Sequence, residues 1–204
     1  MSYWVKTREE LRTHYAPAIE RAQLKTLRHL DVHCQRFIAL SPFVCLGTAG
    51  TSGADVTPRG DRPGFVAVLD DRTLALPDWR GNNRLDSLEN VVGNPEVALL
   101  FLIPGVDETL RVNGTGAITV DPAVLARWQV DGKQPASALI ITVREAYLHC
   151  GKAFIRSKLW AAENKVERSA LPSYGQMLKD QIAVSDTVEE MEASIAHAYR
   201  ERLY

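Results

Sequence analysis

The sequence predicts an α+β fold in which a small antiparallel β-barrel is flanked by helices at both ends. Strand-forming segments separated by Gly, Pro and Asp turns fill residues 42–150, whereas apolar residues at helical spacing lie before and after them. About six strands of this length, with few helical excursions, fit a closed barrel better than a parallel sheet. We expect a single domain over residues 1–204, with helical segments at 1–41 and 151–204.

The N-terminal segment predicts a helix from residue 6 to about residue 40, ended by Ser41-Pro42. Apolar residues spaced by threes and fours place on one face Ile19, Leu27, Leu30, Cys34, Phe37 and Ile38.

The central segment predicts a meander of strands. A strand opens at 43–46 and turns at 50–53, and two more strands flank Asp70-Asp71. A short helix carrying Arg84 and Leu88 follows. The last strands are expected at 97–103, 109–120 and 138–149, with a helix between the final two that Asp121 caps and Pro122 begins.

The C-terminal segment predicts two helices. The first runs from Gly151 to Ala162, and the second starts at a capping-box-like Asp186-Thr187-Val188-Glu189. Its apolar stripe fits packing within the same domain, and a helix that binds a partner stays open as an alternative. Residues 164–173 are a candidate hinge.

The bulk properties favour a soluble protein of a reducing compartment. The 204 residues are 46% hydrophobic and carry a formal net charge of -1, so no overall field attracts polyanions. No stretch resembles a signal peptide or reaches membrane-spanning length. The three cysteines have no metal-type spacing. We expect a cytoplasmic protein without a metal site, nucleic-acid partner or membrane partner.

The most informative polar stretch runs from Arg80 to Asn90 and precedes Asn94-Pro95. It places guanidinium, amide and hydroxyl donors at the start of a short helix, where free N–H groups favour an anion such as a phosphate. An ordinary helix cap explains the same residues.

From Ser41 to about Trp160 the chain resembles the flavin-binding split β-barrel proteins related to pyridoxamine 5'-phosphate oxidase. The matching motifs, in the same order, are Pro58-Arg59-Gly60-Asp61 with Pro63-Gly64-Phe65-Val66, Gly81-Asn82-Asn83-Arg84, Asn94-Pro95 and Leu110-Arg111-Val112-Asn113-Gly114. The resemblance implies a split barrel of Greek-key type that binds flavin mononucleotide (FMN) across the interface of a homodimer.

The resemblance also implies roles for individual residues. Arg59, Arg84 and Ser87 would hold the phosphate, which suits the planar fork of arginine. Gly60, Asn82 and Asn83 would lie beside it, Thr109 would face the flavin where the oxidases have glutamine, and Arg111 matches a family arginine. A barrel would bring the three arginine segments together.

A segment after the last strand resembles one that closes over the flavin, so Lys152, Arg156 and Trp160 are candidates for the substrate side. An ordinary amphipathic helix with Trp160 in the core stays open. The oxidases' C-terminal Arg-Leu-His signature, which meets the vitamin phosphate, is absent.

Other chemistries lack their motifs. Gly47, Gly50 and Gly53 do not make a dinucleotide-binding loop, because the chain continues as a strand rather than a helix. There is no phosphate-binding P-loop and no nucleophile elbow. His29, His33 and Cys34 lack the spacing of a zinc site with an acidic partner.

The sequence therefore predicts an FMN-dependent oxidoreductase that acts on a small organic substrate, because the bound flavin would carry the redox chemistry. No catalytic side chain is assigned. Two alternatives stay open: a non-catalytic carrier or sensor of flavin, haem or a deazaflavin, and an interaction domain whose barrel binds nothing.

Overall fold

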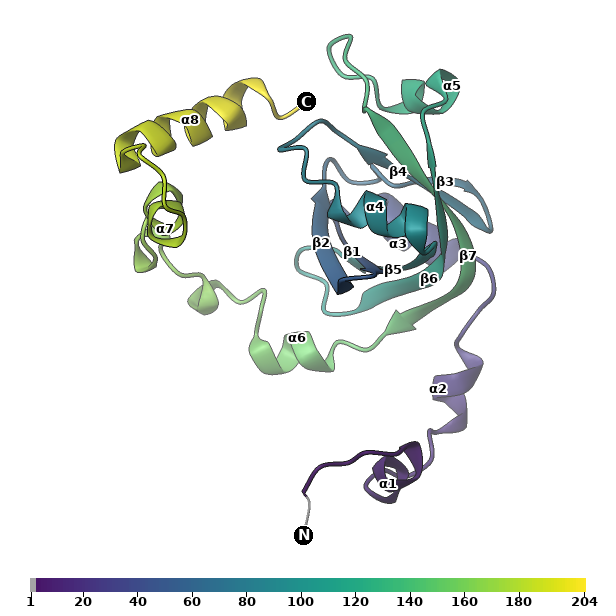
Figure 1. Cartoon of the computed structure of the whole chain (residues 1–204). Coiled ribbons are helices and arrows are strands. Elements are labelled where there is room, and N and C mark those ends of the chain that lie inside the picture. The colour runs from purple at the N-terminus through teal and green to yellow at the C-terminus, as the bar shows by residue number, and fades with distance from the viewer. Residues whose placement is uncertain (1–2) are drawn as a thin grey trace.

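The computed structural model describes residues 3–204 and contains a seven-stranded antiparallel sheet that curls into a barrel (Figure 1). The strands are β1 (Phe43–Gly50), β2 (Gly53–Gly60), β3 (Ala67–Asp70), β4 (Thr73–Asp78), β5 (Glu96–Leu102), β6 (Thr109–Thr119) and β7 (Ser137–His149). Their order across the sheet is β2-β1-β5-β6-β7-β4-β3. The α+β class and the flanking helices are confirmed, and the sheet has one strand more than about six.

The register of the sheet separates an inner face from an outer face. Val44 of β1 lies opposite Phe101 of β5, which lies opposite Leu110 of β6. All three are completely buried, and residues directly opposite one another point to the same face. The intervening residues therefore point outward. The inner face forms one apolar core that also takes in Ile38, Val91 and other residues of the covering helices.

Strands β6 and β7 form the longest pairing, and a bulge at Asn113 and Gly114 shifts its register. A Cβ atom at Gly114 would collide with the main-chain oxygen of Thr142. Only glycine permits this close approach of the two strands, which explains the glycine at the end of the Leu110–Gly114 motif.

The N-terminal segment is not the continuous helix that the sequence predicts. It forms α1 (Arg8–Thr13), α2 (Glu20–Leu24) and α3 (Val32–Leu40). Pro17 lies between the first two, and Leu27 forms a β-bridge with Ala146 through bonds of 2.9 and 2.8 Å. Ile19 is exposed, whereas Leu30, Cys34, Phe37 and Ile38 are buried. The expected apolar face is thus correct only in its second half.

Two helices cover the barrel and the connections between strands. α3 contacts β3, β6 and β7, and α4 (Asp86–Gly93) contacts β1, β2 and β6. Arg84 precedes α4 rather than lying within it, which corrects the expected helix start.

Helix α5 (Pro122–Leu125) leads into a 3-10 turn (Ala126–Trp128). Asp121 caps α5 by accepting a hydrogen bond from Ala123 N at 2.9 Å, as predicted.

The C-terminal segment lies mostly apart from the barrel (Figure 1). It contains α6 (Lys152–Ser157), 3-10 turns at Ala162–Asn164 and Arg168–Ala170, α7 (Tyr174–Gln181) and α8 (Val188–Glu201). The helix expected up to Ala162 ends early because Lys158 adopts a left-handed conformation. The capping box of α8 is confirmed, with Thr187 and Glu190 as its members.

Helix α8 packs mainly against α7, and Met191 is the only residue within α8 that is buried. No helix among residues 3–204 is long and apolar enough to cross a membrane.

Candidate functional site

Arg59 lies at the end of β2, in the row of residues that points into the barrel. It is opposite Val44, and its guanidinium forms an ion pair with Asp78 at the end of β4. Both side chains are largely buried. The Nε of Arg59 is buried and has no hydrogen-bond acceptor among the residues that the structure describes. Buried donors without acceptors are rare in folded proteins, so this N–H is a candidate ligand contact.

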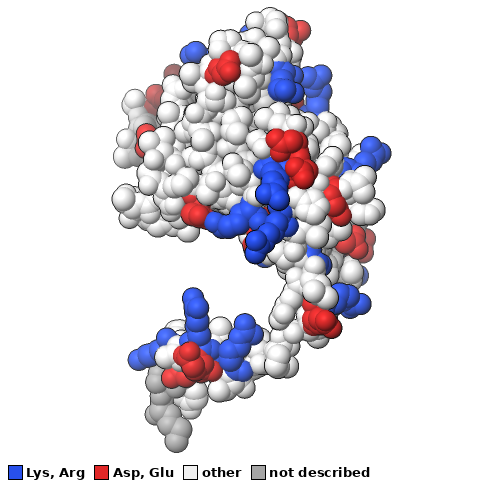
Figure 2. Space-filling view, turned by 90° about the vertical axis from the view of Figure 1, so that its right-hand side faces the viewer, with Lys and Arg blue, Asp and Glu red and all other residues white. Residues whose placement is uncertain are grey.

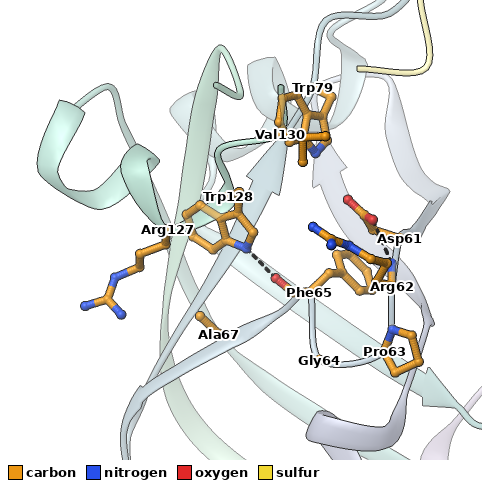
Figure 3. A pocket seen from close by; sticks show the side chains of 10 residues that line it. All are labelled: Asp61, Arg62, Pro63, Gly64, Phe65, Ala67, Trp79, Arg127, Trp128 and Val130. Atoms are coloured by element: carbon orange, nitrogen blue, oxygen red, sulfur yellow. Dashed lines mark hydrogen bonds between the residues drawn. The ribbon is translucent and has the colours of Figure 1, made fainter. Parts of the chain in front are cut away.

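A cavity of about 460 Å³ with aromatic walls lies close by in the chain, because its lining includes Asp61, two residues after Arg59, and Trp79, one residue after Asp78 (Figure 3). Its lining residues are Asp61, Arg62, Pro63, Gly64, Phe65, Ala67, Trp79, Arg127, Trp128 and Val130. Trp128 donates its indole N–H to the main-chain oxygen of Phe65 at 2.7 Å, which fixes one wall. Arg127 points away from the other side chains (Figure 3).

Trp79 directly follows Asp78 and supplies a second unsatisfied donor. Its Nε1 is buried without an acceptor among residues 3–204. Trp79 packs edge to face against Tyr204 at 4.9 Å, and the Tyr204 hydroxyl donates to Asp61 at 2.7 Å. This hydrogen bond and partial burial raise the pKa of Tyr204. Aromatic walls with a few N–H donors suit a planar ring that carries acceptor atoms.

The predicted phosphate residues Asn82, Asn83 and Arg84 lie on the exposed loop before α4. Arg84 is 77% exposed and binds the Asp86 carboxylate through Nε at 2.6 Å. That carboxylate raises the pKa of Arg84. The Asn82 side chain accepts from the Arg84 main-chain N–H at 3.0 Å, and Asn83 has a φ of 60°. These bonds shape the loop without a ligand.

A cavity of about 810 Å³ lies between this loop and the β1–β2 hairpin, but its charge does not favour an anion. Arg84 shares its lining with three carboxylates, those of Asp55, Asp86 and Glu89. Two of these acids lie in the first turn of α4, where they already interact favourably with the helix dipole. A phosphate here would face more negative than positive groups.

Ser87 is buried in α4 and donates its hydroxyl to Asp55 of β2 at 2.9 Å. One turn later Asn90 donates to Thr48 of β1 at 3.1 Å. Both bonds attach α4 to the β1–β2 hairpin. In this structure Ser87 therefore positions a helix.

Thr109 and Arg111 point to the outer face of the sheet, away from Arg59. Arg111 lies opposite Leu100 and Tyr147, in the row next to the fully buried Leu110. Its guanidinium lies 5.2 Å from the centre of the Tyr147 ring. The structure therefore does not bring Arg59, Arg84 and Arg111 together within one chain.

Lys152, Arg156 and Trp160 lie at the opposite end of β7 from α5 and the aromatic cavity (Figure 1). Thirteen residues of strand separate the two ends, about 40 Å if the strand were straight. Trp160 donates to the Val106 main-chain oxygen at 3.0 Å and stacks on Phe154. Within one chain these three residues cannot line that cavity.

The charges of the whole surface are mixed. Figure 2 shows basic and acidic side chains interspersed on the face it presents. Lys and Arg gather on the lower part of the barrel and on the segment before α3, residues 3–31, which we call the N-terminal arm. No group of three or more His, Cys, Asp or Glu side chains within residues 3–204 is arranged to hold a metal ion.

A sequence profile of pyridoxamine 5'-phosphate oxidase matches residues 30–150, more than half of the chain. The chain belongs to the pyridoxamine 5'-phosphate oxidase family. No curated protein sequence matches it. The matched region of this family member contains Arg59, the aromatic cavity and the outer-face residues, and it ends before α6.

Several solved structures are similar to this chain at low sequence identity. HupZ of Group A Streptococcus is 18% identical over 58% of this chain and 92% of its own, with a TM-score of 0.48. A Clostridium acetobutylicum protein of the pyridoxinephosphate oxidase family, related to general stress protein 26, is 18% identical over 58% of this chain and 86% of its own, with a TM-score of 0.45. An FMN-binding protein of Syntrophomonas wolfei is 14% identical over 70% of this chain and 93% of its own, with a TM-score of 0.43.

Sequence reasoning missed Asp78, Trp79 and Trp128. Trp79 lies one residue before the polar stretch that the motif search singled out, and Trp128 ends the segment capped by Asp121. Two tryptophans beside matched motifs were the available signal. Their convergence, however, depends on the long-range pairing of β4 with β7, which local sequence does not encode.

Proposed function

We propose that this protein is an FMN-binding oxidoreductase that works as a homodimer on a small organic substrate. Family membership supports a flavin. The observation that carries the proposal is a pair of unsatisfied buried donors. Trp79 Nε1 belongs to a wall of the aromatic cavity, and Arg59 Nε belongs to the residue whose ion-pair partner, Asp78, directly precedes Trp79.

These residues fit the edge of a flavin. An isoalloxazine ring is planar and carries carbonyl oxygens and ring nitrogens that accept hydrogen bonds. Arg59 would donate to it through Nε while Asp78 keeps the guanidinium in place, and Trp79 would donate from the adjacent position. Trp128 and Phe65 would supply apolar wall and exclude water.

When bound, the flavin supplies hydride chemistry, and the protein supplies orientation and electrostatics. Because Asp78 largely neutralises Arg59, the donor is better suited to an uncharged carbonyl than to a dianionic phosphate. Arg84, on the loop with Asn82 and Asn83, would reach a phosphate only by leaving Asp86. Gly60 lies at the other motif, directly after Arg59 and opposite Phe43.

The homodimer follows from where the remaining motif residues lie. Thr109 and Arg111 face outward, and Lys152, Arg156 and Trp160 lie at the other end of β7. They serve the same ligand as Arg59 only if a second copy contributes them.

The outer face of the sheet has a surface that a second copy would cover. A shallow cavity of about 290 Å³ there is lined partly by small apolar residues such as Gly47, Ala54 and Ala98. Beside them Val56 is 69% exposed. Such a surface loses little conformational entropy when it is buried.

The decisive experiment compares the binding of FMN and riboflavin, which differ only in the phosphate. Fluorescence titrations would use the wild-type protein, Arg59→Lys and Trp79→Phe, with Arg8→Ala on the exposed α1 as the control. Trp79→Phe keeps an aromatic wall and loses one donor, so both ligands should bind about threefold to tenfold more weakly.

An equal loss for both ligands in Arg59→Lys places Arg59 at the ring, and a loss for FMN alone places it at the phosphate. Absence of flavin binding at micromolar concentration would contradict the proposal. Slow reoxidation of bound reduced flavin in air, with no turnover of nicotinamide cofactors, would favour a carrier over an enzyme.

A further inference from the structure

Two basic side chains lie against the ring of Tyr147 on the outer face of the sheet, and a histidine follows on the same strand. Lys25 Nζ lies 5.6 Å from the ring centre, and the Arg111 guanidinium lies 5.2 Å from it. His149 follows two residues later on the same strand and points to the same face. We call Lys25, Arg111, Tyr147 and His149 the outer basic cluster.

The fold holds this cluster in place from two sides. The β-bridge between Leu27 and Ala146 attaches the end of the N-terminal arm to β7. This brings Lys25 close enough to donate to the Leu148 main-chain oxygen at 2.8 Å. From the other side, the register of β6 against β7 sets Arg111 directly opposite Tyr147.

The positive charge of the cluster has no carboxylate partner among the described residues. Neither Lys25 nor Arg111 forms an ion pair there, in contrast to Arg59, Arg84 and Arg144. Glu145, the nearest acid along the same row of β7, accepts a hydrogen bond from Asn113 at 2.7 Å.

The surroundings of His149 are also dominated by positive charge. Partial burial lowers its pKa, and the charges of Lys25 and Arg111 lower it further. No carboxylate is among the groups that act on it. Asp107, on the loop before β6, lies against Gly151.

We propose that the outer basic cluster is a binding site for an anionic oxygen group, a phosphate or a carboxylate, held by Lys25, Arg111 and His149. Cations that lie close together without a counter-ion repel one another, and an anion bound beside them offsets this repulsion. Arg111 offers a planar fork of donors, and Lys25 offers a point charge from the opposite element. The site needs the N-terminal arm, which the family profile does not cover.

The anionic group has two potential sources. One is the phosphate of an FMN whose ring contacts a second copy, and the other is a substrate with its own anionic group. The site itself is independent of the proposed flavin function, because inorganic phosphate tests it directly.

The test is an NMR titration of the histidine Hε1 signals with inorganic phosphate at constant ionic strength, with His149 assigned through His149→Gln. A bound anion stabilises the imidazolium, so the pKa of His149 should rise with phosphate concentration, and the signals of the other histidines serve as internal controls. Lys25→Met should weaken phosphate binding about tenfold. Arg21→Met, on the helix α2 that Lys25 caps, is the matched control.

Equal shifts at all histidines, or wild-type phosphate affinity in Lys25→Met, would overturn the site. Titrations of the wild type and Lys25→Met with FMN and with riboflavin then identify the source of the anionic group. A loss of FMN affinity alone in Lys25→Met assigns the site to the flavin phosphate. Unchanged affinity for both, with phosphate binding still dependent on Lys25, assigns it to another anionic ligand.

Discussion

Replacement of Arg59 by alanine tests whether the Arg59–Asp78 ion pair closes the barrel. β2 is one edge of the sheet, and β4 is next to the other edge, so the pair joins segments that no hydrogen-bonded ladder connects. The side chains are 23% and 14% exposed. Without Arg59, the Asp78 carboxylate stays largely buried with no counter-ion.

The expected cost follows from this burial. Removal of one partner of a fully buried pair costs about 3–5 kcal/mol, and the residual exposure of both side chains lowers this to about 2–4 kcal/mol. For a protein of this length each kcal/mol lowers the melting temperature by about 2–4 °C. Arg59→Ala should therefore melt about 4–16 °C below the wild type.

The assay is thermal and urea unfolding of the ligand-free protein, followed by circular dichroism. Arg84→Ala is the control, because its ion pair with Asp86 is exposed and its loss should change stability little. The double variant Arg59→Ala/Asp78→Ala should be less destabilised than the sum of its single variants. Additive losses, or equal stability of Arg59→Ala and Arg84→Ala, would refute the barrel-closing role.

Three further outcomes are expected. Burial and the Asp31 carboxylate raise the pKa of Cys34 to about 12, so at pH 8 a thiol reagent should modify the exposed Cys150 and leave Cys34 intact, as peptide mass mapping would show. Ser87→Ala should lower the free energy of unfolding by about 1–2 kcal/mol, because it leaves Asp55 without its donor; an unchanged urea midpoint would contradict this. Tyr204→Phe loses the bond to Asp61 but keeps the ring on Trp79, so hydrogen exchange should accelerate in α8, and unchanged exchange would argue against that anchor.

The strands were predictable because their signals are local. Apolar runs between turn residues locate β5, β6 and β7 to within one or two residues. Strand β2 was expected only as a continuation of the chain after the turn at 50–53, because its own sequence is rich in polar and small residues and contains Pro58. Its place in the sheet comes from the hairpin with β1.

The prediction of a continuous N-terminal helix was wrong because a long-range contact decides the conformation there. The spacing of its apolar residues is helical, but Leu27 gains more from main-chain bonds to β7 than from a further helical turn. Tertiary pairing of this kind overrides local periodicity. Pro17 was the one local warning, since proline inside a helical pattern ends or kinks it.

The family motifs predicted the family and one residue beside the site, but not the charges around the motif residues. The resemblance identified the family correctly, and it named Arg59, which lies close in the chain to residues of the aromatic cavity. It could not show that Asp55, Asp86 and Glu89 surround Arg84, because these acids converge from a hairpin and a helix. Charge balance at a site depends on such neighbours, and they lie outside the motifs.

The two faces of the sheet carry a consequence for assembly. Successive side chains along β6 point to opposite faces of the sheet, so Leu110 points into the core and Arg111, the next residue, points away from it. No rotation of a side chain moves Arg111 to the side of Arg59. If both residues bind one ligand, that ligand must lie between two copies of the chain, and a concentration-dependent flavin affinity would follow from mass action. If the flavin binds equally well to a monomer, Arg111 belongs to a different site, and the outer basic cluster provides one.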